Sequence, residues 1–156
     1  KIQEYRYGEQ IKIIQEIEPE VRTEMIPKHI LQPIVENAII HGFLENETEN
    51  FDDEPPYIKI SIHFIRERSY ICLEVKDNGI GIDLNQYEII CKESESFDAS
   101  HEYSRGKHIG IANIKWRLSY LLKEEQVLTI SPCSPHGTLV SILLPVQKTE
   151  NTSVKD

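Results

Sequence analysis

The sequence predicts an α+β domain, a two-layer α/β sandwich in which helices pack on one face of a mixed, mostly antiparallel sheet. Two segments repeat apolar residues every three to four positions, as amphipathic helices do. Several shorter segments alternate apolar and polar residues, as half-buried strands do. Because such helices and strands each have one apolar side, we expect the helices to share one face of the sheet.

The first third of the chain contains one expected strand and one expected helix. Isoleucines alternate with polar residues over residues 11–17, which predicts a strand that ends at Pro19. Pro27 then suits the first turn of a helix that we expect to continue to Phe43. The buried stripe of this helix is expected to consist of Leu31, Val35, Ala38, Ile39 and Gly42.

The middle of the chain is expected to form a hairpin followed by a long polar connection. Apolar and polar residues alternate over 57–65 and again over 70–77, which predicts two antiparallel strands joined at residues 66–69. Residues 84–108 lack long-range periodicity, apart from a short helical pattern over 84–91. A polar connection of this length in a compact domain is usually a lid or a binding loop.

The last third is expected to form a second helix and a closing pair of strands. Residues 109–125 repeat apolar side chains at helical spacing. The alternating segments 127–131 and 138–145 predict two strands separated by the turn 132–137. The apolar stripe of the second helix is expected to consist of Ile111, Ile114, Leu118, Leu121 and Leu122.

The composition describes one acidic domain. The chain has 156 residues, with 17 Lys and Arg against 26 Asp and Glu, for a formal net charge of −9. Nucleic acids and anionic membranes are held by many basic residues acting together, so neither is expected as a partner. The three cysteines lie far apart without a CxxC pair, so their spacing indicates neither a disulfide framework nor a zinc site. We expect a soluble domain in a reducing compartment.

Three polar residues, Glu36, Asn37 and His41, interrupt a helix that is otherwise almost wholly apolar. Burying such groups without partners costs about 1–3 kcal/mol each, so a bound molecule or another polar group should reach them. Asn37 and His41 are four residues apart, which lets a carboxamide and an imidazole face one bound object. The alternative is that all three cap loops or meet strand ends.

Asp77 and the glycines after it form a second candidate site. Asp77 ends a strand, and Gly79 and Gly81 remove side chains from two alternate positions. The backbone can then pass close to a flat ligand, while the carboxylate accepts a hydrogen bond from an exocyclic amine. The alternative is an ordinary turn, because Asp-Asn-Gly is a common turn sequence.

Two further segments could contact a ligand. Gly106, Lys107 and Gly110 lead into the second helix, where free N–H groups and the helix dipole favour an anion. The alternative there is a helix start punctuated by glycines. Thr138 opens the last strand, and its hydroxyl could join Asp77 in holding a base. Taken alone, Thr138 is an ordinary strand residue.

The order of these motifs resembles a known family. The series ENAxxHG, DNGxGI, a long loop, GxxxGIxNI and GT is similar to the N box and the two glycine boxes of the GHKL ATP-binding fold, or Bergerat fold. Histidine kinases, DNA gyrase and MutL share this fold. More narrowly, the segments RYGEQ, IPKHILQPIVENAIIHG, VKDNGIGID and IGIANIKWRL resemble the catalytic domain of LytS/YesM-type sensor histidine kinases. The likeness covers residues 5–145.

This resemblance implies ATP and Mg²⁺ as ligands and gives each motif a role. Asn37 would ligate the Mg²⁺, and His41 would approach the phosphates. Asp77 would accept a hydrogen bond from the adenine amino group. The other residues implied by the resemblance are Gly79, Gly81, Ile82 and Thr138 around the base, and Gly106, Lys107, Gly110 and Ile111 around the phosphates.

The role of Glu36 separates a kinase from its alternatives. Glu36 matches a position that activates water in the ATPase relatives, whereas in a kinase it would only polarise or orient. His108 replaces a glycine of the second glycine box, and residues 84–108 lack a paired phenylalanine. A kinase is therefore weighed against a GHKL ATPase and against a nucleotide-sensing module without transfer activity.

The resemblance also implies a larger protein with partners. Residues 1–10 would end a linker from a dimerisation and phosphoacceptor segment, 11–146 would form the catalytic domain, and 147–156 a polar tail. The γ-phosphoryl would pass to a histidine upstream of Lys1 and then to a response regulator. The whole protein is expected to be a membrane-anchored homodimer, with this domain in the cytoplasm and out of direct contact with the membrane.

Overall fold

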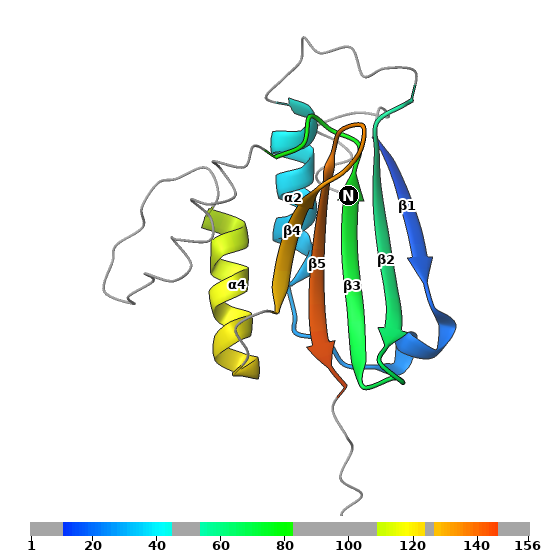
Figure 1. Ribbon diagram of the computed structural model, residues 1–156, viewed down its shortest axis with the longest axis vertical. Coiled ribbons are helices and arrows are strands. Elements are labelled where there is room, and N and C mark those ends of the chain that lie inside the picture. The colour runs from blue at the N-terminus through cyan, green and yellow to red at the C-terminus, as the bar shows by residue number, and fades with distance from the viewer. Residues whose placement is uncertain (1–10, 45–53, 83–108, 124–126, 147–156) are drawn as a thin grey trace, which may run out of the picture.

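The computed structural model describes residues 11–44, 54–82, 109–123 and 127–146. It contains a five-stranded sheet in the order β1-β2-β3-β5-β4, with helices α2 and α4 on one side of it (Figure 1). The strands are β1 (Lys12–Ile17), β2 (Tyr57–Ile65), β3 (Tyr70–Asp77), β4 (Leu128–Pro132) and β5 (Thr138–Pro145). The helices are η2 (Pro19–Thr23), α2 (Leu31–Ile39), η3 (Ile40–Leu44) and α4 (Ile109–Leu122). The expected α+β sandwich is confirmed.

The sheet is mixed, as the sequence predicts. β1 runs parallel to β2, and the remaining neighbours, β2–β3, β3–β5 and β5–β4, are antiparallel. β3 lies at the centre, and its last residue, Asp77, faces the start of β5 at the same end of the sheet. The end of the central strand is therefore flanked by neighbouring backbone, and this is where the candidate site lies.

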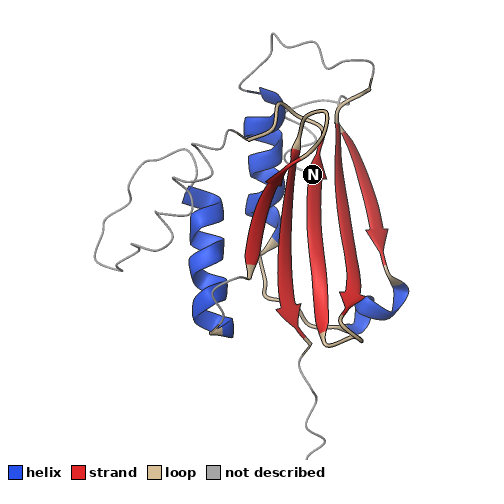
Figure 2. Ribbon diagram, in the orientation of Figure 1, coloured by secondary structure: helices blue, strands red, loops and turns tan. Residues whose placement is uncertain are grey.

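The core lies between the sheet and the two helices. Alternate residues of each inner strand point into it, because successive side chains of a strand point to opposite faces. No described helix covers the opposite face of the sheet, which Figure 2 shows toward the viewer. The largest fully buried side chains are Ile34, Ile58, Ile71, Leu73, Val75, Leu118, Val127 and Ile142.

The first long helix differs from its expected form at both ends. It begins at Leu31 rather than near Pro27, and it widens into the π-helical η3 from Ile40. Its buried stripe runs through Ile34 and Ala38, whereas Leu31 and Val35 are only half-buried. The expected burial of Ala38, Ile39 and Gly42 is confirmed, whereas full burial of Leu31 and Val35 is not, because apolar residues surround much of this helix and periodicity alone does not choose among them.

The second long helix, α4, buries a narrower stripe of side chains than the sequence predicts. Ile111, Ile114 and Leu118 are buried, but Leu121 is 54% exposed, so its expected place in the core is wrong. α4 packs against α2 and has no described neighbour on its outer side. The short helix η2 was not expected at all, although it buries Val21. The pattern over 84–91 and the rest of the expected lid lie outside the described residues.

None of the described helices is long and apolar enough to cross a membrane.

Candidate functional site

A pocket opens between α2, the start of α4 and the end of the sheet where β3 terminates. The space between its walls is about 520 Å³ when the open solvent at its mouth is included. Four polar side chains line it: Asn37, His41, Asp77 and Thr138. The remaining lining residues are Ile34, Ala38, Gly42, Val75, Gly81, Ile82, Ile111, Ile130 and Val140.

Asp77 is the most deeply placed polar group of the pocket, with 4% of its surface exposed. Its Oδ1 accepts hydrogen bonds from the backbone N–H of Gly79, at 3.0 Å, and of Thr138, at 3.2 Å. Burial raises the pKa of the carboxyl from 3.8 to about 6, while these two bonds oppose the rise. Neither bond uses Oδ2. Asp77 is therefore a fixed, buried acceptor at the end of an apolar slot.

Glycines allow the backbone segments around Asp77 to approach one another closely. A Cβ added at Gly79 would lie 2.4 Å from the carbonyl oxygen of Gly42, which belongs to η3, the helical turn that follows α2. Gly137 has a φ of +109°, and a Cβ there would lie 2.1 Å from the carbonyl oxygen of Asp77. Any side chain would separate these segments, so the glycines fix the shape of the site.

Asn37 and His41 approach the pocket from the helical side. Asn37 lies in the last turn of α2, and its Nδ2 is buried without a hydrogen-bond partner among the described residues. A buried donor left without a partner costs about 1–3 kcal/mol, so a ligand that pairs with this carboxamide removes a penalty. His41 follows in η3 and is half-buried. π-Helical turns inside α-helices occur frequently at functional sites.

The structure brings together seven of the residues named from the sequence and leaves others apart. The seven lining the pocket are Asn37, His41, Asp77, Gly81, Ile82, Ile111 and Thr138. Gly79 lies against Gly42 rather than in the lining. Glu36 accepts a hydrogen bond from Gln32 Nε2 at 2.9 Å and does not line the pocket. Gly110 lies in the first turn of α4, and Gly106 and Lys107 lie outside the described residues.

Sequence reasoning missed the residue that anchors the strand end. Asn78 is 7% exposed; its Oδ1 accepts from the N–H of Tyr57 at 2.7 Å, and its Nδ2 donates to the carbonyl of Pro55 at 3.3 Å. These bonds tie the loop after β3 to the start of β2 and so hold Asp77 in place. The Asp-Asn-Gly sequence indicates a turn, but only the strand pairing shows where the amide of Asn78 points.

Comparison with known proteins agrees with this geometry. Residues 23–148 match the model of a family described as histidine kinase-, DNA gyrase B- and HSP90-like ATPases. The chain belongs to this ATPase family. The resemblance expected from the motifs is therefore confirmed.

Several relatives of this ATPase-family domain are sensor proteins. It is 32% identical over 144 residues to the sensor histidine kinase YesM of Bacillus subtilis, covering 92% of this chain and 21% of that protein. It is 26% identical over 153 residues to the sensor protein LytS of Bacillus cereus, covering 98% and 24%. The sensor protein kinase HptS of Staphylococcus aureus is 28% identical over 149 residues, with coverages of 94% and 26%. The chain thus spans about a quarter of the length of these relatives.

The fold of the domain also matches a solved structure. The mycobacterial sensor histidine kinase MprB aligns with a TM-score of 0.58 over 94% of this chain and 89% of that chain, at 16% sequence identity. At this identity the likeness concerns the fold of the ATPase family alone.

Proposed function

We propose that the domain binds ATP with Mg²⁺ in the pocket and, within the whole protein, transfers the γ-phosphoryl group to a histidine upstream of residue 1. A response regulator would receive the phosphoryl group from that histidine. The whole protein would be a membrane-anchored homodimer with this domain on the cytoplasmic side. The single observation that carries the proposal is Asp77, a buried carboxylate fixed at the end of an apolar slot in a chain of this family.

Asp77 recognises the adenine amino group. Oδ1 is already engaged by Gly79 and Thr138, so Oδ2 is the oxygen offered to the amine. The apolar side chains of Val75 and Ile82 line the same pocket and suit the faces of a flat base. Thr138 acts by holding Asp77 through its backbone N–H.

Asn37 and His41 hold the phosphate end. The two atoms of a carboxamide differ only by a rotation of the group, so the place of the unpartnered Nδ2 can equally present Oδ1 to a cation. Amide oxygens are among the hard oxygen ligands that Mg²⁺ takes. When bound, the ion neutralises charge on the phosphates. From the second glycine box we also assign to the phosphate end Gly106, Lys107, Gly110 and Ile111.

The position of Glu36 supports transfer over hydrolysis. A carboxylate that activates water has to lie within hydrogen-bond reach of that water at the reacting phosphate. Glu36 instead accepts a hydrogen bond from Gln32 and does not line the pocket. This observation favours a kinase, in which the nucleophile comes from another segment.

Replacement of Asp77 tests the base-recognition step. Asp77→Asn should weaken ATP binding by about 1.5–3 kcal/mol, roughly tenfold to 150-fold, because a charge-assisted hydrogen bond is lost. Isothermal calorimetry measures this. Glu67→Gln, an exposed change in the β2–β3 turn, is the matched control. Unchanged affinity in Asp77→Asn would contradict the assignment of the adenine site.

Replacement of Asn37 tests the metal ligand. Asn37→Ala should abolish the enhancement of ATP binding by Mg²⁺ while leaving the affinity for adenosine largely intact, because adenosine lacks the phosphates. Calorimetry with and without Mg²⁺ separates the two effects. If Mg²⁺ still strengthens ATP binding in this variant, Asn37 is not a ligand of the ion.

Transfer itself is tested on the full-length protein with γ-labelled ATP. We expect the label on a histidine upstream of residue 1, as an acid-labile phosphoimidazole, and its loss when that histidine is replaced by glutamine. Release of free phosphate without labelled protein would instead indicate the ATPase alternative. ATP binding without either product would indicate the nucleotide-sensing alternative.

A further inference from the structure

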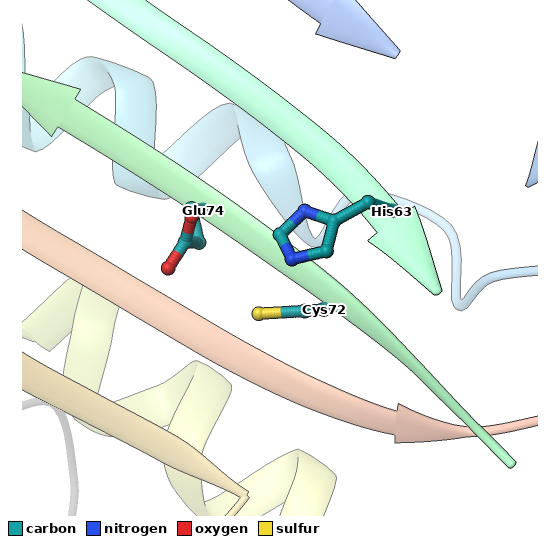
Figure 3. Close-up of side chains that lie close together, drawn as sticks. All are labelled: His63, Cys72 and Glu74. Atoms are coloured by element: carbon teal, nitrogen blue, oxygen red, sulfur yellow. The ribbon is translucent and has the colours of Figure 1, made fainter. Parts of the chain in front are cut away.

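Three potential metal ligands meet on the face of the sheet that no described helix covers. His63 on β2 pairs directly with Cys72 on β3, and Glu74 follows two residues later on the same face of β3. One ligand atom from each, an imidazole nitrogen, a thiol sulfur and a carboxylate oxygen, lies within 4.8 Å of the other two. Figure 3 shows the three side chains close together over the two strands.

We propose that His63, Cys72 and Glu74 form a zinc site on this open face, separate from the nucleotide pocket. Zinc is bound in proteins by these three ligand types, and three protein ligands leave a fourth position for water or another group. Bond lengths of about 2.0–2.3 Å and tetrahedral angles separate ligand atoms by about 3.4–3.6 Å. The ligand atoms, which lie within 4.8 Å of one another, would have to move closer together when zinc binds.

The carboxylate and thiol are held by their surroundings. Ser141 on β5 donates a hydrogen bond from Oγ to Glu74 Oε1 at 3.3 Å, and such outer partners orient metal ligands. Cys72 is only 7% exposed, between its strand neighbours His63 and Leu143. Because adjacent antiparallel strands carry the ligands, their backbone positions are fixed before a metal arrives. The other two ligands, His63 and Glu74, are half-buried, which leaves the site open to solvent.

The chemistry of the ligands favours a metal such as zinc over Mg²⁺ and Ca²⁺. Thiolate and imidazole suit zinc and copper, whereas Mg²⁺ and Ca²⁺ require oxygen ligands. The Mg²⁺ that we assign to the nucleotide pocket would therefore not compete here. Burial and the neighbouring Glu74 raise the pKa of the Cys72 thiol, and zinc binding displaces that proton. Binding is best measured at mildly alkaline pH for this reason.

A cobalt titration tests the site directly. The chain is used without an affinity tag and with Cys91→Ser and Cys133→Ser, so that Cys72 is the sole thiol. We expect one equivalent of Co²⁺ to give thiolate-to-cobalt absorption in the presence of excess Mg²⁺, and Zn²⁺ to remove it. Absence of this absorption, or weak binding of several equivalents, would overturn the proposal.

Variants of the three ligands supply the second arm. Cys72→Ser should remove the absorption, and His63→Gln and Glu74→Gln, at half-buried positions that tolerate change, should each weaken binding by at least about tenfold. His29→Asn, an exposed histidine outside the cluster, is the matched control. If His63→Gln and Glu74→Gln bind as tightly as the control, the three residues do not form one site.

Thermal melting separates this site from the nucleotide pocket. A ligand that binds only the folded state raises its melting temperature, so Zn²⁺ should raise that of the sole-thiol protein and not that of its Cys72→Ser derivative. Asn37→Ala, in the helix α2 that packs on the other face of the sheet, should keep the zinc-induced rise even if it loses its response to Mg²⁺. Loss of the rise in Asn37→Ala would place the zinc in the nucleotide pocket and overturn the proposal.

Discussion

The two faces of the sheet differ in how deeply the side chains of the central strand, β3, are buried. On the face covered by the helices, β3 presents Leu73, Val75 and, at its end, Asp77; on the open face it presents Cys72 and Glu74. Burial raises the pKa of Asp77 to about 6. On the open face, Lys59 and Glu16 form an ion pair at 2.8 Å, and their side chains are 34% and 60% exposed. Burying a polar group on the covered face costs free energy, so a polar group there indicates a bound molecule. On the open face polar groups are common, so a binding site is indicated only where several metal-binding side chains come close together.

The largest expected effect comes from removing apolar volume on the covered face. Ile142→Ala should lower the free energy of unfolding by about 4 kcal/mol, because Ile142 is 0% exposed and the change leaves a cavity. Its neighbour Leu143, half-buried on the open face, is the matched control. Leu143→Ala should cost about 1 kcal/mol. Urea denaturation measures both, and equal losses would mean that the two faces do not differ in packing.

The pH dependence of stability tests whether the covered face removes the Asp77 carboxyl from water. The pKa of Asp77 is higher in the folded chain, about 6, than its ordinary value of 3.8. The folded state therefore holds this proton more tightly, and the resulting stability is complete below pH 3.8 and is lost as the pH rises through about 6. The loss amounts to about 3 kcal/mol, since each pKa unit corresponds to about 1.4 kcal/mol.

The measurement is a difference between two proteins, so that other carboxyl groups cancel. The free energy of unfolding of the natural chain minus that of Asp77→Asn should fall by about 3 kcal/mol between about pH 3 and about pH 8. A difference that stays constant over this range would show that the carboxyl is not desolvated.

The smallest of the three effects concerns the glycines that join the two layers beside Asp77. Gly79→Ala should cost about 2 kcal/mol, because the new Cβ would lie 2.4 Å from the carbonyl oxygen of Gly42 and the backbone has to move. Gly42→Ala is the control for stability, since its nearest contact would be an ordinary 3.5 Å to Asp77 Oδ1. Thermal unfolding of the two variants compares them. Similar melting temperatures would contradict the close approach.

Much of the fold could be predicted because its signals are local. The strands at 57–65 and 70–77 follow from strict alternation, and their observed bounds are identical. The helices were found by periodicity, but their buried faces were partly misplaced, as Leu121 shows. A helix buries the side that meets a neighbour, and the sequence of one helix does not contain the position of the other.

The sequence by itself determined the strands and the two long helices, the order of the motifs and the family to which they belong. Only the tertiary structure decided which polar groups meet. It places Asn37 and His41 opposite Asp77, directs Glu36 to Gln32 and uses Asn78 to hold the strand end. Cysteine spacing gave no sign of zinc, yet the pairing of β2 with β3 sets Cys72 beside His63 and Glu74. The physical reason is that alternation fixes a residue's face, whereas its neighbours on that face depend on strand register, which is set by packing across the whole sheet.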